Sequence, residues 1–276
     1  MSDEPEEPTG HSPESAFERT VEEGRRRLAR STSALAATGL VGGIDVGIGV
    51  LGLLLVKHAT GSEMLAGLAF TIGFIALTLA RSELFTENFL VPVIAVVARQ
   101  STLLRLLRLW GGTLVCNLIG GWVLTWLLMA GFPELRRTAI SAGSRYVRFG
   151  LGWRAFALAL VAGLVITLMT WMQHAVDALS GRIVAAVIAS FLLGAGTLDH
   201  AIVASLVMFA ALHAGHAPFG YLRWLETALF AALGNLIGGV GLVTLLRLLQ
   251  VPERLARRRA RPDPIVAERS EGRSAA

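Results

Sequence analysis

The pentapeptide Asn117-Leu-Ile-Gly-Gly121 recurs as Asn235-Leu-Ile-Gly-Gly239, and each copy lies inside a long apolar stretch. Internal repeats in membrane proteins place a substrate site where the copies meet, near the middle of the bilayer. A soluble enzyme core has no comparable use for such a repeat. The motif therefore predicts a membrane protein built from two copies of one unit.

The composition also places the chain in lipid. Of the 276 residues, 54% are hydrophobic and only 16% are charged, and the mean hydropathy is +0.61. These values lie outside the range of ordinary soluble domains. The net charge of +5 is carried almost entirely by arginine in tails and loops, which favours a membrane surface over nucleic acid as its partner. Cys116 is the single cysteine, so no intrachain disulfide and no cysteine-built metal site is expected.

Six stretches are long and apolar enough to cross the hydrocarbon core, which takes roughly 20 helical residues. They are Ala34–Val56, Met64–Ala98, Leu103–Ala130, Trp153–Ala175, Ile183–Ala214 and Leu222–Gln250. The second and fifth stretches are too long for one straight crossing, and polar residues interrupt them at 81–88 and 194–200. Non-helical backbone at membrane depth is tolerated only inside protein or beside a water-filled cavity. We therefore expect both breaks to line a pathway.

These features predict an all-α integral membrane protein with six transmembrane helices in an inverted 3+3 repeat, the second and fifth helices being broken. Three spans per half make the second half cross the membrane in the opposite sense. The repeats would cover about 34–130 and 153–250 within a channel domain at 34–250. Residues 1–33 are expected to form a cytoplasmic tail that is disordered at its start, and residues 251–276 a basic, solvated cytoplasmic tail.

The distribution of arginine sets the orientation. If both termini are cytoplasmic, the inner side carries more arginines than the outer side, including the runs at 25–27 and 257–259. The loop between the third and fourth spans does not follow this rule, because it would lie outside and yet holds Arg136, Arg137 and Arg145. The balance predicts a multi-pass protein of the bacterial inner membrane with both termini in the cytoplasm.

His200 is the histidine nearest the middle of the bilayer, directly after Asp199 and a break flanked by glycines. An ionisable group at that depth is costly, which favours a functional role. A protonated imidazole would attract a small anion and could hand it a proton, so that it crosses as a neutral acid. The alternative is a neutral histidine satisfied by Asp199 or by a carbonyl.

Charged residues also occur in the first break and in the first span. Glu83 and Glu87 follow Arg81, so a structural ion pair is as well supported as a role in the pathway. Asp45 is a lone carboxylate in the middle of the first span and requires a partner or a proton.

Uncharged residues near the breaks suggest a lining for the pathway. Thr86 offers a hydroxyl, and Phe85, Phe74 and Leu193 offer apolar constrictions, although plain core packing explains them equally. Asn117 and Asn235 can bond backbone groups that the breaks leave free, an architectural role. The chain shows no Ser/His/Asp constellation, phosphate-binding loop or His/Cys metal spacing, so we expect no enzyme activity, cofactor or metal.

Three motifs carry a resemblance to a known family: Glu83-Leu-Phe-Thr86, Asp199-His200 and Gly234-Asn-Leu-Ile-Gly-Gly239. They resemble the formate/nitrite transporter family, over roughly 34–250. The resemblance implies an aquaporin-like protomer, a homopentamer, and one pore per protomer for small monovalent anions such as formate, nitrite or hydrosulfide.

The same resemblance implies roles for single residues. His200 would be the central pore histidine, with Asp199 where a glutamate is usual. Leu84, Phe85 and Thr86 would belong to a mobile loop, Phe74 and Leu193 to two constrictions, and Asn235 to the polar position of the sixth span. Departures from the family pattern make this a divergent member: Arg81 replaces a glycine, Glu87 a small residue, and Gly163 and Ala204 two asparagines, while the usual lysine before the fourth span has no match, Arg148 lying near.

Three hypotheses follow. The first is a passive or proton-coupled channel for a small monovalent anion or its neutral acid. The second is an aquaporin-like channel for a small neutral solute, although the paired Asn-Pro-Ala signature is absent. The third is a non-transporting membrane scaffold or sensor. Each has membrane lipid as a partner and none requires nucleic acid.

Overall fold

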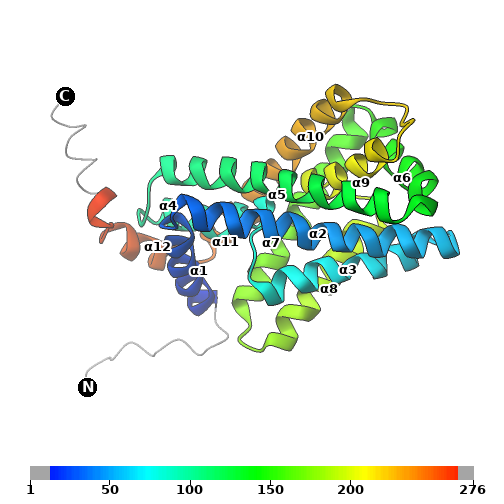
Figure 1. Ribbon diagram of the computed structural model, residues 1–276. Helices are drawn as coiled ribbons and strands as arrows, with labels where there is room; N and C mark the ends of the chain where they lie inside the picture. The colour runs from blue at the N-terminus through cyan, green and yellow to red at the C-terminus, as the bar shows by residue number, and fades with distance from the viewer. Residues whose placement is uncertain (1–12, 267–276) are drawn as a thin grey trace, which may run out of the picture.

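The computed structural model describes residues 13–266, and every regular element among them is helical (Figure 1). The first part of the chain forms α1 (Pro13–Leu28), α2 (Thr32–Thr60), α3 (Glu63–Ala80), η1 (Phe85–Phe89), α4 (Val91–Val97) and α5 (Leu103–Gly131). The second part forms η2 (Pro133–Leu135), α6 (Arg136–Phe149), α7 (Trp153–Ala175), α8 (Leu179–Ala195), α9 (Ala201–His213), α10 (Tyr221–Leu236), η3 (Ile237–Thr244), α11 (Leu245–Leu249) and α12 (Pro252–Arg259).

Five helical segments are long and apolar enough to cross a membrane: α2, α3, α5, α7 and the continuous run Tyr221–Leu249. The run Tyr221–Leu249 joins α10 and α11 through η3, an eight-residue π-helix. The stretch 183–214 is covered by two shorter apolar helices, α8 of 17 residues and α9 of 13. The chain is thus a helical, multi-pass membrane protein.

The backbone leaves the α-helix at two polar segments. After α3, Arg81 takes left-handed φ of 54°, residues 82–84 are not helical, and the 3-10 helix η1 precedes α4. After α8, Thr197 takes left-handed φ of 48°, and α9 begins only at Ala201. The polar segments at 81–88 and 194–200 therefore lie between short helices.

Two capping residues set the boundary between α2 and α3. Gly61 ends α2 in the left-handed conformation, with φ of 68°, and its N–H donates to the Lys57 carbonyl at 2.9 Å. Ser62 then caps α3, its Oγ accepting the Leu65 N–H at 3.3 Å. This two-residue connection folds α3 back against α2, and α3 packs on its other side against α8.

Both tails include ordered helices that pack on the body. The start of the N-terminal tail, 1–12, lies outside the described residues, but α1 buries Phe17, Val21 and Leu28 and packs against α4. At the other end Val251 is buried, and Arg258 Nε donates to a Glu18 carboxylate oxygen at 2.8 Å. The helix α12 follows residue 250, contains no buried residue and lies beside α1 (Figure 1). A solvated tail after residue 250 stays a prediction.

Candidate functional site

Asn117 on α5 holds the first non-helical segment in place. Its Oδ1 accepts the Phe85 N–H at 2.8 Å, and its Nδ2 donates to the Glu83 carbonyl at 2.8 Å and to the Gly39 carbonyl at 2.7 Å. The side chain is fully buried. One amide therefore satisfies the N–H and the carbonyl of the non-helical segment and ties that segment to α2 through the Gly39 carbonyl.

Asn235 on α10 makes the corresponding set of bonds to the second segment. Its Oδ1 accepts the Ala201 N–H at 2.9 Å, and its Nδ2 donates to the carbonyls of Asp199, at 2.9 Å, and Ala159, at 2.8 Å. It too is fully buried. The two asparagines of the repeated motif thus fix two polar segments by the same three-bond pattern.

A glycine makes room for each asparagine on the neighbouring helix. A Cβ at Gly43 of α2 would collide with the Asn117 carbonyl, and a Cβ at Gly163 of α7 would collide with the Asn235 carbonyl. The helices approach this closely because neither position carries a side chain. Gly163, a departure from the family pattern in the sequence, is therefore a packing residue.

Thr86 and His200 meet at the centre of the site. Thr86 lies in η1, His200 is the N-cap of α9, and the distance from Thr86 Oγ1 to His200 Nε2 is 2.7 Å. Both side chains are fully buried. The two segments held by the asparagines thus place one hydroxyl and one imidazole side by side.

The backbone sets the tautomer of the histidine. The Val203 N–H donates to His200 Nδ1 at 3.2 Å, so that nitrogen carries no proton. A neutral imidazole then has its proton on Nε2, which donates to Thr86 Oγ1. The Thr86 hydroxyl hydrogen is consequently left as a donor toward another group.

Asp199 is buried beside this pair, and its Oδ1 has no hydrogen-bond partner among the described residues. Tyr146 of α6 is also buried, and its pKa is raised first by burial and then by the nearby negative charge of Asp199. Asp199 does not bond the imidazole. The sequence alternative of a neutral, satisfied histidine names other partners than the structure shows, because a hydroxyl and a backbone N–H satisfy the ring here.

The apolar candidates are all buried in one core cluster, namely Phe74, Leu84, Phe85 and Leu193. Phe85 and Phe89 begin and end the 3-10 helix that contains Thr86, and their rings pack edge-on with centroids 4.9 Å apart. Phe74 and Leu193 come from α3 and α8, which pack together.

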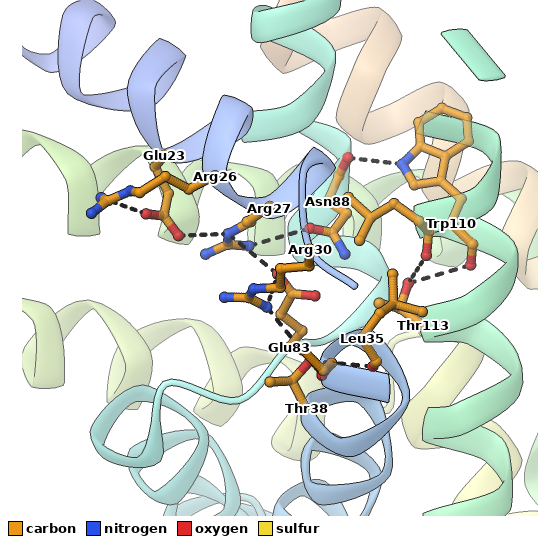
Figure 2. A network of polar contacts seen from close by, with 12 residues as sticks. Glu23, Arg26, Arg27, Arg30, Leu35, Thr38, Glu83, Asn88, Trp110 and Thr113 are labelled. Carbon is orange, nitrogen blue, oxygen red and sulfur yellow. Dashed lines mark hydrogen bonds and ion pairs between the residues drawn. The ribbon is translucent and has the colours of Figure 1, made fainter. Parts of the chain in front are cut away.

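Two arginines, one in the last turn of α1 and one directly after that helix, neutralise Glu83, as Figure 2 shows. Arg30 Nη1 lies 2.6 Å from a Glu83 carboxylate oxygen and Arg27 Nε lies 3.6 Å from the same oxygen. The side chain of Glu83 is only 1% exposed, so its charge depends on these partners. Arg81 does not pair with it, in contrast to the sequence expectation, because Arg81 is an exposed cap of α3.

Two further charged candidates are Glu87 and Asp45. Glu87 is buried in η1, directly after Thr86. Asp45 is half-buried on α2 and accepts a hydrogen bond from the Ser82 hydroxyl, which supplies the partner that the sequence did not reveal. No group of three or more His, Cys, Asp or Glu side chains is placed to hold a metal ion within residues 13–266.

Sequence reasoning missed three groups at this site: Arg27, Arg30 and Tyr146. The first two lie in a segment that reads as a polar tail. A signal was present, because Phe17, Val21, Gly24 and Leu28 recur at the three- and four-residue spacing of a helix face.

Comparisons with known proteins agree with this geometry. A sequence model of the formate/nitrite transporter family matches residues 14–249. The inner membrane protein YfdC of Escherichia coli (strain K12) is 29% identical over 258 residues, which are 91% of this chain and 82% of YfdC. The formate channel BtFdhC of Bacillus thuringiensis is 26% identical over 248 residues, 84% of this chain and 93% of that protein.

Two solved structures have the same fold. An FNT family ion channel superposes with a TM-score of 0.74 at 19% identity, covering 86% of this chain and 99% of the channel. A pentameric formate channel with formate bound superposes with a TM-score of 0.65 at 20% identity, covering 80% of this chain and 98% of that channel chain. The fold and the family match together define a helical membrane channel or transporter. This chain belongs to the formate/nitrite transporter family.

Proposed function

We propose that this protein is a channel for a small monovalent anion or its neutral acid, with Thr86 and His200 at the narrow centre of the pathway. The observation that carries the proposal is the 2.7 Å contact between these side chains, at the meeting point of two non-helical segments. Backbone of this kind is expected at membrane depth only beside a pathway or inside protein. The likeness to proteins named formate channels supports formate as one substrate.

The tautomer of His200 gives the pair its chemistry. The Thr86 hydroxyl, which accepts from Nε2–H, is free to donate its own hydrogen to an entering carboxylate. In a low-dielectric constriction the anion is far less costly once it carries a proton. Protonation of the imidazole places the second proton on Nδ1, in place of the hydrogen bond from the Val203 N–H. The Nε2 proton then passes to Thr86 Oγ1 while the Thr86 hydroxyl hydrogen passes to the anion, and the neutral acid, an intact hydroxyl and a neutral imidazole result. The imidazole takes a proton back from solution before the next passage.

The apolar side chains around the pair have the complementary role of keeping water out. Phe74 and Leu193 would form the two constrictions, and Leu84 and Phe85 the mobile segment between them. Narrow apolar rings of this type block ions by remaining dry. The site therefore favours a small acid over a hydrated ion.

The architecture that we propose is six spans in an inverted 3+3 repeat, with the second and fifth interrupted. The matching bonds of Asn117 and Asn235 support it, since each pins the segment that follows the second helix of its half. The close approach of Gly43 to the Asn117 carbonyl, and of Gly163 to the Asn235 carbonyl, supports it as well, because a Cβ at either glycine would collide with that carbonyl. An inverted repeat brings two such segments together near the midplane.

The assembly that we propose is a homopentamer in the bacterial inner membrane with both termini in the cytoplasm. A related structure is described as a pentameric formate channel, and one relative is named an inner membrane protein. The contact between Glu18 and Arg258 supports termini on the same side. The arginine distribution favours the cytoplasm for that side.

Replacement of His200 tests the proposal. In reconstituted vesicles, H200N is expected to reduce formate, nitrite and hydrosulfide flux about tenfold or more and to remove its pH dependence between pH 5 and 8. The control is H213N, which removes a half-buried histidine at the far end of α9. Unchanged, pH-dependent flux in H200N would sink the mechanism, and water permeability well above that of empty vesicles would point to the neutral-solute alternative.

A further inference from the structure

Helices α1 and α6 pack on the body in the same manner. A Cβ at Gly24 of α1 would lie 2.5 Å from the Val91 carbonyl oxygen and 2.7 Å from the Ala95 Cβ, both in α4. A Cβ at Gly143 of α6 would lie 2.7 Å from the Ala211 Cβ and 3.1 Å from the Val207 carbonyl oxygen, both in α9. In each case a glycine allows close contact with a carbonyl and an alanine that lie one turn apart on the neighbouring helix.

The two pairs stand at opposite ends of the molecule. Figure 1 shows α1 and α4 near the beginning of α2 and α6 and α9 near its end. The helices α4 and α9 are the pieces that follow the two non-helical segments. Each of α1 and α6 therefore covers the second piece of one interrupted span, which is the relation expected of equivalent helices in an inverted repeat.

Each of these helices also brings a polar side chain near an acidic residue of the non-helical segment in its own half. One helical turn after Gly24, Arg27 lies near Glu83, and three residues after Gly143, Tyr146 lies near Asp199. Glu83 and Asp199 are the residues whose carbonyls Asn117 and Asn235 hold. The equivalence of α1 and α6 thus extends to the two non-helical segments that carry Thr86 and His200.

In the first half this arrangement forms a continuous set of contacts from α1 to the pore pair. Arg30 fixes the side chain of Glu83 at 2.6 Å, while Asn117 fixes the Glu83 carbonyl and the Phe85 N–H. Thr86 follows directly and meets His200.

The far side of Thr86 is held from α1 and α5. Arg27 Nη1 donates to Asn88 Oδ1 at 3.2 Å, and Trp110 Nε1 donates to the Asn88 carbonyl at 2.9 Å. Figure 2 shows Arg27, near the end of α1, pointing toward Glu83 and Asn88, and Arg30, just after α1, pointing toward Glu83. Residues on both sides of Thr86 are thus bound by arginines at the end of α1 and directly after it.

We propose that α1 is the first helix of the repeated unit, with α6 as its counterpart, and that Arg27 and Arg30 are positioning residues for Thr86. They act through Glu83 and Asn88 and touch no substrate. This inference rests on the proposed function for the role of Thr86. Without Arg30, the buried Glu83 carboxylate is left with the more distant Arg27 and moves toward water, which draws the adjoining residues with it. A shift of about 1 Å is enough to break the Thr86–His200 hydrogen bond.

The experiment compares R30Q with R26Q in the full-length protein. Arg26 is a matched control because its side chain is 69% exposed and pairs only with Glu23 of its own helix. The main readout is the ring ¹⁵N–¹H signal of His200 Nε2 in histidine-labelled protein, assigned by its absence in H200N. In R30Q we expect this signal to shift and its proton to exchange faster with water, and we expect flux to fall about tenfold. R26Q should match the unmodified protein.

The conservative variant R30K keeps a cation beside Glu83 and leaves the Arg27 contact unchanged, so it should return the His200 signal toward its original position. It decides the question if R30Q does not fold. A folded R30Q with an unchanged His200 signal, or a folded R30K whose signal is displaced as far as that of R30Q, would overturn the proposal. The ring signal does not depend on transport, so a chain that carries no anion would still test the positioning role.

Discussion

At the scale of single residues, asparagine is the side chain that the two non-helical segments require. Its amide offers one acceptor and two donors on one rigid group, which bind one N–H and one carbonyl of the non-helical segment and one carbonyl of a neighbouring helix. Aspartate lacks the donors, and a serine lacks the reach. This explains why the motif repeats with asparagine at its head.

Removal of either amide tests this reading. N117A and N235A each leave one N–H and one carbonyl of a buried non-helical segment unsatisfied, so each is expected to lower the free energy of unfolding by about 3 kcal/mol. Thermal unfolding in detergent measures the effect. The control is I119A, a half-exposed side chain on the same helix as Asn117. Equal melting temperatures for N117A and I119A would contradict the architectural role.

The architectural role of both asparagines was predictable from sequence, because an amide inside an apolar span must bond something and the breaks supply free backbone. Their exact partners were not. Gly39 and Ala159 lie on other spans, and only the folded arrangement brings those carbonyls within reach. Arg81 was assigned wrongly for the same reason, since Arg30 lies closer to Glu83 in space but far from it in the chain.

At the scale of elements, α1 shows how a polar composition can hide a docked helix. Its buried face is Phe17, Val21, Gly24 and Leu28, and its other residues are mostly charged, so average composition indicates a tail. Packing against α4 stabilises the helix more than its intrinsic propensity does.

The charges of α1 make its docking depend on pH. Burial acts to raise the pKa of Glu23, but Arg27 and Arg26 outweigh it, so the pKa of Glu23 lies below its ordinary value. A carboxyl with a lowered folded-state pKa stabilises the fold above its unfolded pKa of about 4.3, and the contribution is lost as the pH falls through the folded value.

E23Q is therefore expected to lower the unfolding free energy at pH 7 by about 0.5–1 kcal/mol, and by less at pH 3.5. Melting curves in detergent at the two pH values measure the difference. E22Q, which removes a carboxylate from the exposed face of the same helix, serves as the comparison. A deficit in E23Q that does not change with pH would show that the ion pairs are not its cause.

At the scale of the whole molecule, the exterior is as apolar as the core. Met64, Leu65, Leu68 and Ile72 on α3 are each about half exposed, and Val184, Ile188 and Leu192 on α8 are similar. In water such faces would aggregate, so lipid or other copies of the chain must cover them.

The proposed homopentamer makes a direct prediction for this exterior. Native mass spectrometry of the protein released from detergent is expected to show a complex five times the mass of the 29.4 kDa chain. Stepwise loss of subunits at higher collision energy would confirm the count. Spectra that contain only the single chain under the gentlest conditions would contradict a stable pentamer.

The sequence by itself determined the membrane class, the repeated pentapeptide and the two polar interruptions, and it singled out His200 as a candidate. All of these follow from local quantities: apolar length, the cost of an ionisable group in lipid, and a recurring pentapeptide. Tertiary structure alone decided which groups meet. The Thr86–His200 contact, the arginines on Glu83 and the match between α1 and α6 join residues far apart in the chain. Their proximity depends on how helices pack, which no local pattern encodes.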